Sequence, residues 1–260
     1  MKSRLAFFSI ATLLLALIVF VIPSITAPPM GLLNASEVFA ASPAQYSVGY
    51  VGCSNTEDTV GGYYLVSDEN LFWRPYDTAG GTLDRWANPN NGFVTNFWAN
   101  FDQELQRYGQ PLKVWIQICE DAQRKLTFED VQKTINLLRE RVPRAKYYIS
   151  PLNSFSPTDI CQITGPNGVQ DATNLADEAV SSGLALQGPI LGPLRGSQTL
   201  PPGMCHPNTA GQTLLGSQLS LFFDTSGMTA AIYDHTLMLS SSLCTGKRVP
   251  SAGSNPILTR

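Results

Sequence analysis

The chain has 260 residues with 17 basic and 20 acidic side chains, which gives a formal net charge of −3. This charge leaves no basic footprint for nucleic acid, and a charged fraction of 14% beside a hydrophobic fraction of 43% argues against a long disordered chain. We therefore expect one globular domain of about 200 residues once the termini are set aside.

The N-terminus predicts export. Lys2 and Arg4 precede the apolar run from Leu5 to Ile22, the pattern of a secretory signal, with small-residue cleavage candidates at 25–27 and 38–40. The run is also nearly long enough to span a bilayer, so an uncleaved anchor that tethers the protein to a membrane is the alternative. We assign residues 1–27 to this signal peptide or anchor and residues 28–45 to a linker. The expected location is secreted or cell-surface.

The first expected element of the domain is a buried strand at residues 47–51 that ends at Gly52. Glycine permits a sharp turn there, and Ser54 then stands at the carboxyl edge of a sheet, where open α/β sheets bind ligands. In the plainer interpretation, Ser54 only caps the segment that follows. Gly61 and Gly62 predict a loop, and the pair Gly80 and Gly81 predicts a turn whose amides face a ligand.

Periodic apolar residues then predict helices that alternate with strands. Phe97, Phe101, Leu105 and Tyr108 lie on one face of a helix that Gly109 ends, and Thr127 with Asp130 resembles a capping box. The expected strands are 113–119 and 146–150, and the later helices are 128–142, 171–184 and 209–223. This alternation predicts an α/β fold with a central parallel sheet covered on both faces.

Export makes disulfides available to the five cysteines, and an odd number leaves one unpaired within the monomer. Cys53 and Cys119 each end a strand, and adjacent parallel strands would bring them together; two buried free thiols are the alternative. Cys161 and Cys205 form the second candidate pair, and Cys244 is left over.

His206, one of two histidines, lies in the segment Cys205-His206-Pro207-Asn208 just before the last helix. A serine needs such a base to become a nucleophile, whereas a surface-loop histidine is the plainer interpretation. His235 fits a structural or surface role. The two histidines lack metal-ligand spacing with each other, so we expect neither a metal nor another cofactor.

Taken together, the ordered blocks resemble the SGNH (GDSL-type) hydrolase family over residues 46–224. These blocks are Gly-x-Ser-Asn-Thr after the first strand, a Gly-Gly turn, Val-Trp-Ile-Gln-Ile, Tyr-Tyr-Ile-Ser-Pro, and His-Pro-Asn before the last helix. The resemblance implies a three-layer α/β/α, flavodoxin-like fold. It also implies ester hydrolysis with Ser54 as nucleophile, His206 as base, and the amides of Ser54 and Gly80 or Gly81 as the oxyanion hole.

Two family positions differ in this chain. Cys119-Glu120-Asp121 stands where the family has its oxyanion asparagine, and Gly203 stands where the family has the acid three residues before histidine. We expect a main-chain carbonyl at 200–203, or Glu120 or Asp121, to orient His206. Glu57 and Asp58 are further carboxylates that could reach the imidazole.

The sequence therefore predicts a serine esterase or deacylase acting on a small-molecule or glycan ester, such as an O-acetyl group on an extracellular glycan. The alternative is a non-catalytic glycan-binding or envelope protein on the same scaffold. Phe72, Trp73, Tyr76 and Trp86 would stack on sugar rings in that alternative, or else pack in the core. Residues 225–260 read as a C-terminal extension.

Overall fold

The computed structural model describes residues 44–90, 96–157, 159, 161–200 and 205–225. A parallel four-stranded sheet lies at its centre in the order β1-β2-β3-β4. Its strands are β1 (Val48–Val51), β2 (Lys113–Ile118), β3 (Lys146–Pro151) and β4 (Leu186–Gln187). A parallel bridge between Val48 and Phe72 continues the sheet beyond β1. If the segment at Phe72 is counted as a strand and the strands are numbered by their order along the chain, their order across the sheet is 2-1-3-4-5, as in flavodoxin-like folds.

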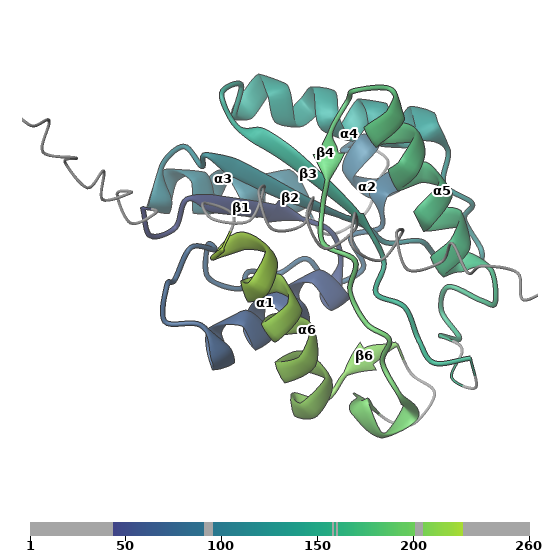
Figure 1. Ribbon diagram of the computed structural model, residues 1–260. Coiled ribbons are helices and arrows are strands. Elements are labelled where there is room, and N and C mark those ends of the chain that lie inside the picture. Colours follow the sequence, from purple (N-terminus) through teal and green to yellow (C-terminus); the bar gives the residue numbers. More distant parts are fainter. Residues whose placement is uncertain (1–43, 91–95, 158, 160, 201–204, 226–260) are drawn as a thin grey trace, which may run out of the picture. The chain divides into compact units, whose positions relative to one another are not determined.

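Helices cover both faces of the sheet (Figure 1). On one face lie α1 (Ser54–Val66) and α6 (Thr209–Phe223), and on the other lie α2 (Leu83–Ala87), α4 (Phe128–Arg141) and α5 (Gly168–Ser181). The remaining long helix is α3 (Phe97–Tyr108), whose Phe101 ring lies 5.1 Å from that of Trp73. The expected three-layer α/β/α fold is thereby confirmed.

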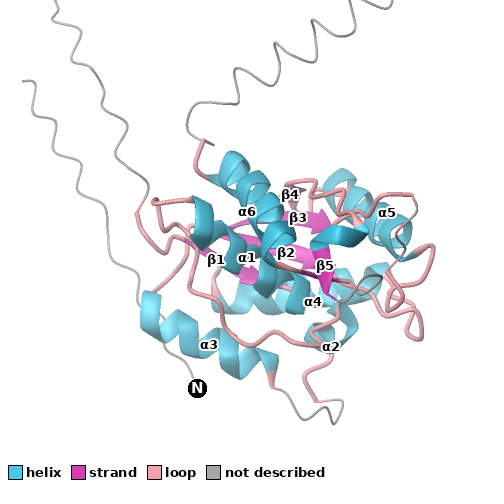
Figure 2. Ribbon diagram, turned by 90° about the horizontal axis from the view of Figure 1, so that it is seen from below, coloured by secondary structure: helices cyan, strands magenta, loops and turns pink. Residues whose placement is uncertain are grey.

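Short elements connect β4 to α6. They are the 3₁₀ helix η1 (Gly196–Gln198) and the antiparallel pair β5 (Thr199–Leu200) and β6 (His206–Pro207), in which Leu200 pairs with His206. Figure 2 shows the same domain from below. The sequence predicted a proline- and glycine-rich loop in this region and missed these two-residue strands.

The core is built from aromatic and β-branched side chains that suit strands buried on both faces. Every residue of β1 is buried, and Trp115 of β2 has no exposed surface. Phe72, Trp73 and Trp86 are fully buried and Tyr76 is 8% exposed, so these four aromatics pack in the core. The suggestion that they form a sugar-stacking surface is wrong.

Helix ends follow local chemistry. Thr127 and Asp130 form the expected capping box of α4, and Gly109 follows the last residue of α3 with a positive φ of 79°. The helix that we expected at 171–184 instead spans Gly168–Ser181, because Gly183 adopts a φ of 72° and ends the helical path. The amides of Leu184 and Ala185 then return to the carbonyl of Ala179.

Gly61 and Gly62 do not form the expected loop, because both lie inside α1. A Cβ atom on Gly62 would lie 1.9 Å from the carbonyl oxygen of Gln212, and one on Gly216 would lie 2.1 Å from the carbonyl carbon of Gly62. The backbones of α1 and α6 therefore touch at this crossing. Gly62 has no side chain because the two helices need this close approach. In the sequence alone, such a glycine cannot be distinguished from one in a loop.

Several expectations fall outside the described residues. They concern the N-terminal signal or anchor, most of the linker, nearly all of the C-terminal extension, Gly203, His235 and Cys244. Within the described ranges, no helix has both the length and the apolar character needed to cross a membrane.

The α1–α6 crossing gives the first prediction. Gly62→Ala should destabilise the fold by at least about 1–3 kcal/mol, the usual cost of overpacking, because its new methyl group meets main-chain atoms. Gly61→Ala is the matched control. Apart from its own stretch of helix, no atom of the described residues lies within 4 Å of the position that its new methyl group would take, so the better helix propensity of alanine should stabilise the fold by about 0.5–1 kcal/mol. Urea unfolding measures both, and equal effects of the two substitutions would contradict this packing role.

Candidate active site

Ser54 is the first residue of α1, directly after the turn that ends β1. The turn is fixed by its neighbours: the Cys53 carbonyl accepts the amides of Thr56 and Glu57, and also the hydroxyl of Thr78 at 2.8 Å. The Cys53 amide in turn donates to Thr56 Oγ1 at 2.9 Å. Ser54 therefore presents its hydroxyl and its main-chain amide from a rigid corner at the carboxyl edge of the sheet.

His206 reaches Ser54 from the other end of the domain sequence. Ser54 Oγ lies 3.3 Å from His206 Nε2, a distance typical of a nucleophile and its base in an empty site. Asn208 holds the segment by capping α6, since its side chain accepts the amides of Ala210 and Gly211. The packing of α6 on α1 thus brings His206 to the helix that carries Ser54.

The acid beside His206 is Asp58. Its Oδ2 lies 3.0 Å from His206 Nδ1, and its Oδ1 accepts a hydrogen bond from Gln212 Nε2 at 3.1 Å. Asp58 follows Ser54 by four residues on α1, and this spacing places both side chains on one helix face. A serine, a histidine and an aspartate are therefore joined in sequence by two hydrogen bonds.

Our leading expectation for this acceptor was wrong. Neither Glu120 nor Asp121 fills the position, because Asp58 occupies it, and the carbonyls of residues 201–203 lie outside the described ranges. Glu120 is buried near Asp171, and burial raises the pKa of its carboxyl group. Asp121 closes a turn in which its side chain accepts the amide of Gln123. Asp58 was among the carboxylates considered, but reading Gly61 and Gly62 as a loop hid the helical spacing that singles it out.

Charge around the imidazole favours its protonated form. The hydrogen bond that His206 donates to Asp58 raises the pKa of His206 above its usual value of 6.5, against an opposing effect of burial, and the nearby charges of Asp58 and Glu57 raise it further. Burial also raises the pKa of Glu57 itself. Because the folded pKa of His206 is raised, its stabilising contribution is complete below about pH 6.5 and is lost as the pH rises through the folded value.

Of the expected oxyanion donors, Ser54 and Gly80 remain and Gly81 does not. The Gly81 amide donates to the carbonyl of Thr78 at 2.9 Å. A Cβ on Gly81 would lie 2.3 Å from the Gly52 carbonyl oxygen, so this glycine permits close packing of the turn on the end of β1. Among the described residues, no hydrogen bond uses the amides of Ser54 or Gly80.

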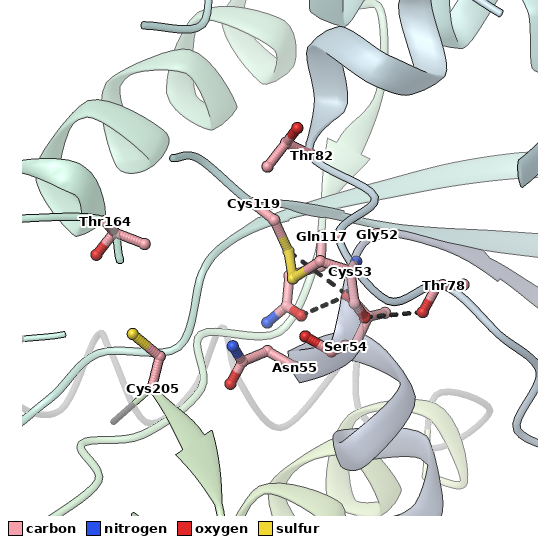
Figure 3. The surroundings of a disulfide bond; sticks show 12 residues. Gly52, Cys53, Ser54, Asn55, Thr78, Thr82, Gln117, Cys119, Thr164 and Cys205 are labelled. Carbon is pink, nitrogen blue, oxygen red and sulfur yellow. Dashed lines mark hydrogen bonds between the residues drawn. A yellow bond between two sulfur atoms is a disulfide. The ribbon is translucent and has the colours of Figure 1, made fainter. Parts of the chain in front are cut away.

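Two disulfides flank the site. Cys53–Cys119 joins the ends of β1 and β2, as expected, and Cys161–Cys205 is the second expected pair. Figure 3 shows Ser54 and Asn55 immediately after the first of these bonds. Disulfides persist in oxidising compartments, and their presence here indicates that the protein folds in such an environment.

Asn153 is a polar residue at this edge that our sequence interpretation did not single out. It follows β3 by two residues and is fully buried, and neither atom of its amide group has a hydrogen-bond partner among the described residues. The residue before it, Leu152, packs on the Cys53–Cys119 disulfide. An asparagine directly after a buried strand was the available signal in the sequence.

In the part of the chain that the structure describes, no three His, Cys, Asp or Glu side chains lie close enough together to hold a metal ion. Ser54, His206 and Asp58 form a hydroxyl–imidazole–carboxylate array, the set of groups that serine hydrolases use as nucleophile, base and orienting acid.

The site predicts how His206 titrates. In an NMR titration the pKa of His206 should lie above 6.5. It should fall in Asp58→Asn, because the neutral amide that replaces the carboxylate does not stabilise the imidazolium ion. Glu57→Gln is the control: it removes a nearby charge and leaves the Asp58 hydrogen bond, so the decrease should be smaller. An unchanged pKa in Asp58→Asn would show that the two side chains are not paired in solution.

No family model and no curated protein matches the chain. An uncharacterised protein of known structure aligns with 72% of this chain and 99% of its own length, at 11% sequence identity and a TM-score of 0.48. A likeness at this level carries no information about activity. The functional argument therefore depends on the residues of the site itself.

Proposed function

We propose that the protein is an extracellular serine hydrolase of the SGNH type that cleaves carboxylic esters. The observation that carries this proposal is the continuous array from Ser54 through His206 to Asp58, with contacts of 3.3 and 3.0 Å. A serine hydroxyl becomes a useful nucleophile when a base accepts its proton and an acid fixes the tautomer of that base. Ser54 supplies the hydroxyl, His206 the base and Asp58 the acid.

The chemistry follows from the positions of the protons. Asp58 accepts the Nδ1 hydrogen of His206, which leaves Nε2 free to take the proton of Ser54 as its oxygen attacks the ester carbonyl. The amides of Ser54 and Gly80 are the candidate donors to the resulting oxyanion. Collapse of this intermediate expels the alcohol, which takes the proton from Nε2. Water then attacks the acyl-serine and gives a proton to Nε2 of His206. Collapse of the second intermediate breaks the bond to Ser54, which takes that proton back from Nε2 as the acid leaves.

The position of the acid removes the main objection to catalysis. The loss of a triad acid can cost about four orders of magnitude in rate, and the family position of that acid is Gly203 in this chain. Asp58 supplies a carboxylate to the same imidazole nitrogen from α1. The second departure, at Glu120 and Asp121, removes one oxyanion donor at a typical cost of about 10²–10³ in rate.

The proposed substrate is defined only as a class, a carboxylic ester outside the cell. Export and disulfide bonds suit an ester outside the cell, such as an O-acetyl group on a glycan. The non-catalytic glycan-binding alternative loses the support of the aromatic side chains, because Phe72, Trp73 and Trp86 are fully buried.

Ser54→Ala should abolish turnover of short-chain acyl esters and labelling by a serine-reactive phosphonate. It should leave the melting temperature nearly unchanged, because Ser54 Oγ makes its contact at the partly exposed site rather than in the core. Ser181→Ala, at an exposed serine that ends α5, controls for labelling of other hydroxyl groups. Labelling that persists in Ser54→Ala would place the nucleophile elsewhere.

Asp58→Asn should reduce kcat by about 10⁴-fold if the carboxylate fixes the imidazole tautomer. In the wild-type protein the rate should rise as the pH increases through the raised pKa of His206, because only the neutral imidazole accepts the serine proton. Glu57→Gln should retain most of this rate. A pH–rate profile of the three proteins measures both effects, and equal rates in wild type and Asp58→Asn would contradict the assigned role.

A further inference from the structure

Each residue of the proposed nucleophile–base pair follows a disulfide-bonded cysteine. Cys53 directly precedes Ser54 and Cys205 directly precedes His206, and their sulfur partners are Cys119 and Cys161. All four cysteines are buried, at 7% exposure or less. Cys53–Cys119 thus ties the residue before Ser54 to the end of β2, and Cys161–Cys205 ties the residue before His206 to the segment between β3 and α5. The two differ in how much else holds that residue in place.

Ser54 is held independently of its disulfide. Four hydrogen bonds fix the main chain of Cys53: its carbonyl accepts from Thr56, Glu57 and Thr78, and its amide donates to Thr56 Oγ1. The helix α1 continues from Ser54 and packs on α6 through Gly62. These contacts fix the nucleophile whether or not Cys53 is bonded to Cys119.

Among the described residues, His206 has fewer anchoring contacts on its amino-terminal side than Ser54 has, and residues 201–204 lie outside the described ranges. It belongs to a strand of two residues, β6, paired with the equally short β5. Asn208 anchors the chain after the histidine through α6 and through its bonds to Ser197 and Thr199. Before the histidine, Cys205 is 1% exposed and is covalently bonded to Cys161.

Cys161 is itself well anchored. Its carbonyl accepts the amide of Gly165 at 2.9 Å, and the amide of Thr164 lies 3.4 Å from its sulfur. The carbonyl of Ile163 accepts the amide of Ala122, which connects this segment to the turn after β2. The disulfide therefore attaches the residue before His206 to a segment that is fixed to the carboxyl edge of the sheet.

We propose that the Cys161–Cys205 disulfide is a positioning clamp that holds the His206 imidazole between Ser54 and Asp58, whereas Cys53–Cys119 contributes stability alone. This inference rests on the proposed function for its kinetic consequence. Its structural consequence, the contact of His206 with Asp58, is independent of any activity.

The chain offers a matched comparison. The two bonds join cysteines 66 and 44 residues apart, and because loop entropy depends only weakly on length, their removal should destabilise the fold by similar amounts. We would compare the double variants Cys161→Ala/Cys205→Ala and Cys53→Ala/Cys119→Ala with the wild type. The readouts are kcat and KM on a short-chain acyl ester, the melting temperature, and the NMR-titrated pKa of His206, with His235→Asn used for assignment.

Loss of Cys161–Cys205 should reduce kcat about 100-fold, the effect of a misplacement of about 1 Å, with a smaller change in KM. The pKa of His206 should fall toward 6.5 as the Asp58 hydrogen bond is lost. Loss of Cys53–Cys119 should reduce kcat by no more than about threefold and leave this pKa unchanged. Equal kinetic and pKa effects in the two variants would overturn the clamp.

Failure of the proposed function gives a different result. A wild-type protein without ester turnover would overturn the hydrolase proposal, while the pKa comparison still decides the clamp. If the double variant does not fold, partial reduction of the wild type by a phosphine, followed by alkylation and peptide mapping, replaces it. Residual activity, or the His206 signal, should then follow the intact fraction of Cys161–Cys205. Dependence on Cys53–Cys119 instead would refute the proposal.

Discussion

The close backbone contact between α1 and α6 is the constraint on which the site depends. Gly62 and Gly216 meet where any side chain would collide with main-chain atoms, so the helices approach more closely than larger residues allow. At the other end of the pair, Tyr63 and Ser67 donate to the carboxylate of Asp224 at 2.9 and 2.7 Å. His206 precedes α6 by only a few residues, and its approach to Ser54 follows from this packing.

A single helix supplies two members of the array. Ser54 and Asp58 lie one turn apart on α1, so helix geometry alone fixes the nucleophile relative to the acid. The remaining variable is the placement of the imidazole between them. Gln212 on α6 holds the second oxygen of Asp58, which couples the acid to the same helix packing that delivers the histidine. The precision of the site thus depends on the packing of α6 on α1 and on the short segment that leads from His206 into α6.

The sequence predicted what local patterns determine. Buried strands, the capping box at Thr127 and the last helix at 209–223 follow from periodicity and turn residues. The two disulfides were candidate pairs based on the order of the elements, and the pairing of Ser54 with His206 was expected from the family resemblance. It failed where tertiary packing overrides a local signal. Gly62 resembles a loop residue until α6 is known to touch it, and that error concealed the helical spacing of Ser54 and Asp58. The hydrogen bond that occupies the Gly81 amide likewise depends on a turn that composition does not specify.

The proposed reaction creates one positive and one negative charge, and groups on α1 stabilise both. Proton transfer creates a positive imidazolium beside Asp58, and attack creates a negative oxyanion beside the amide of Ser54. The first-turn amides of a helix carry partial positive charge, which favours the oxyanion, while a carboxylate one turn later favours the imidazolium. Glu57 strengthens the second effect, since its charge also raises the pKa of His206. Because both stabilising groups belong to one rigid element, they need no rearrangement as the charges develop, which is the condition under which fixed dipoles lower a barrier most.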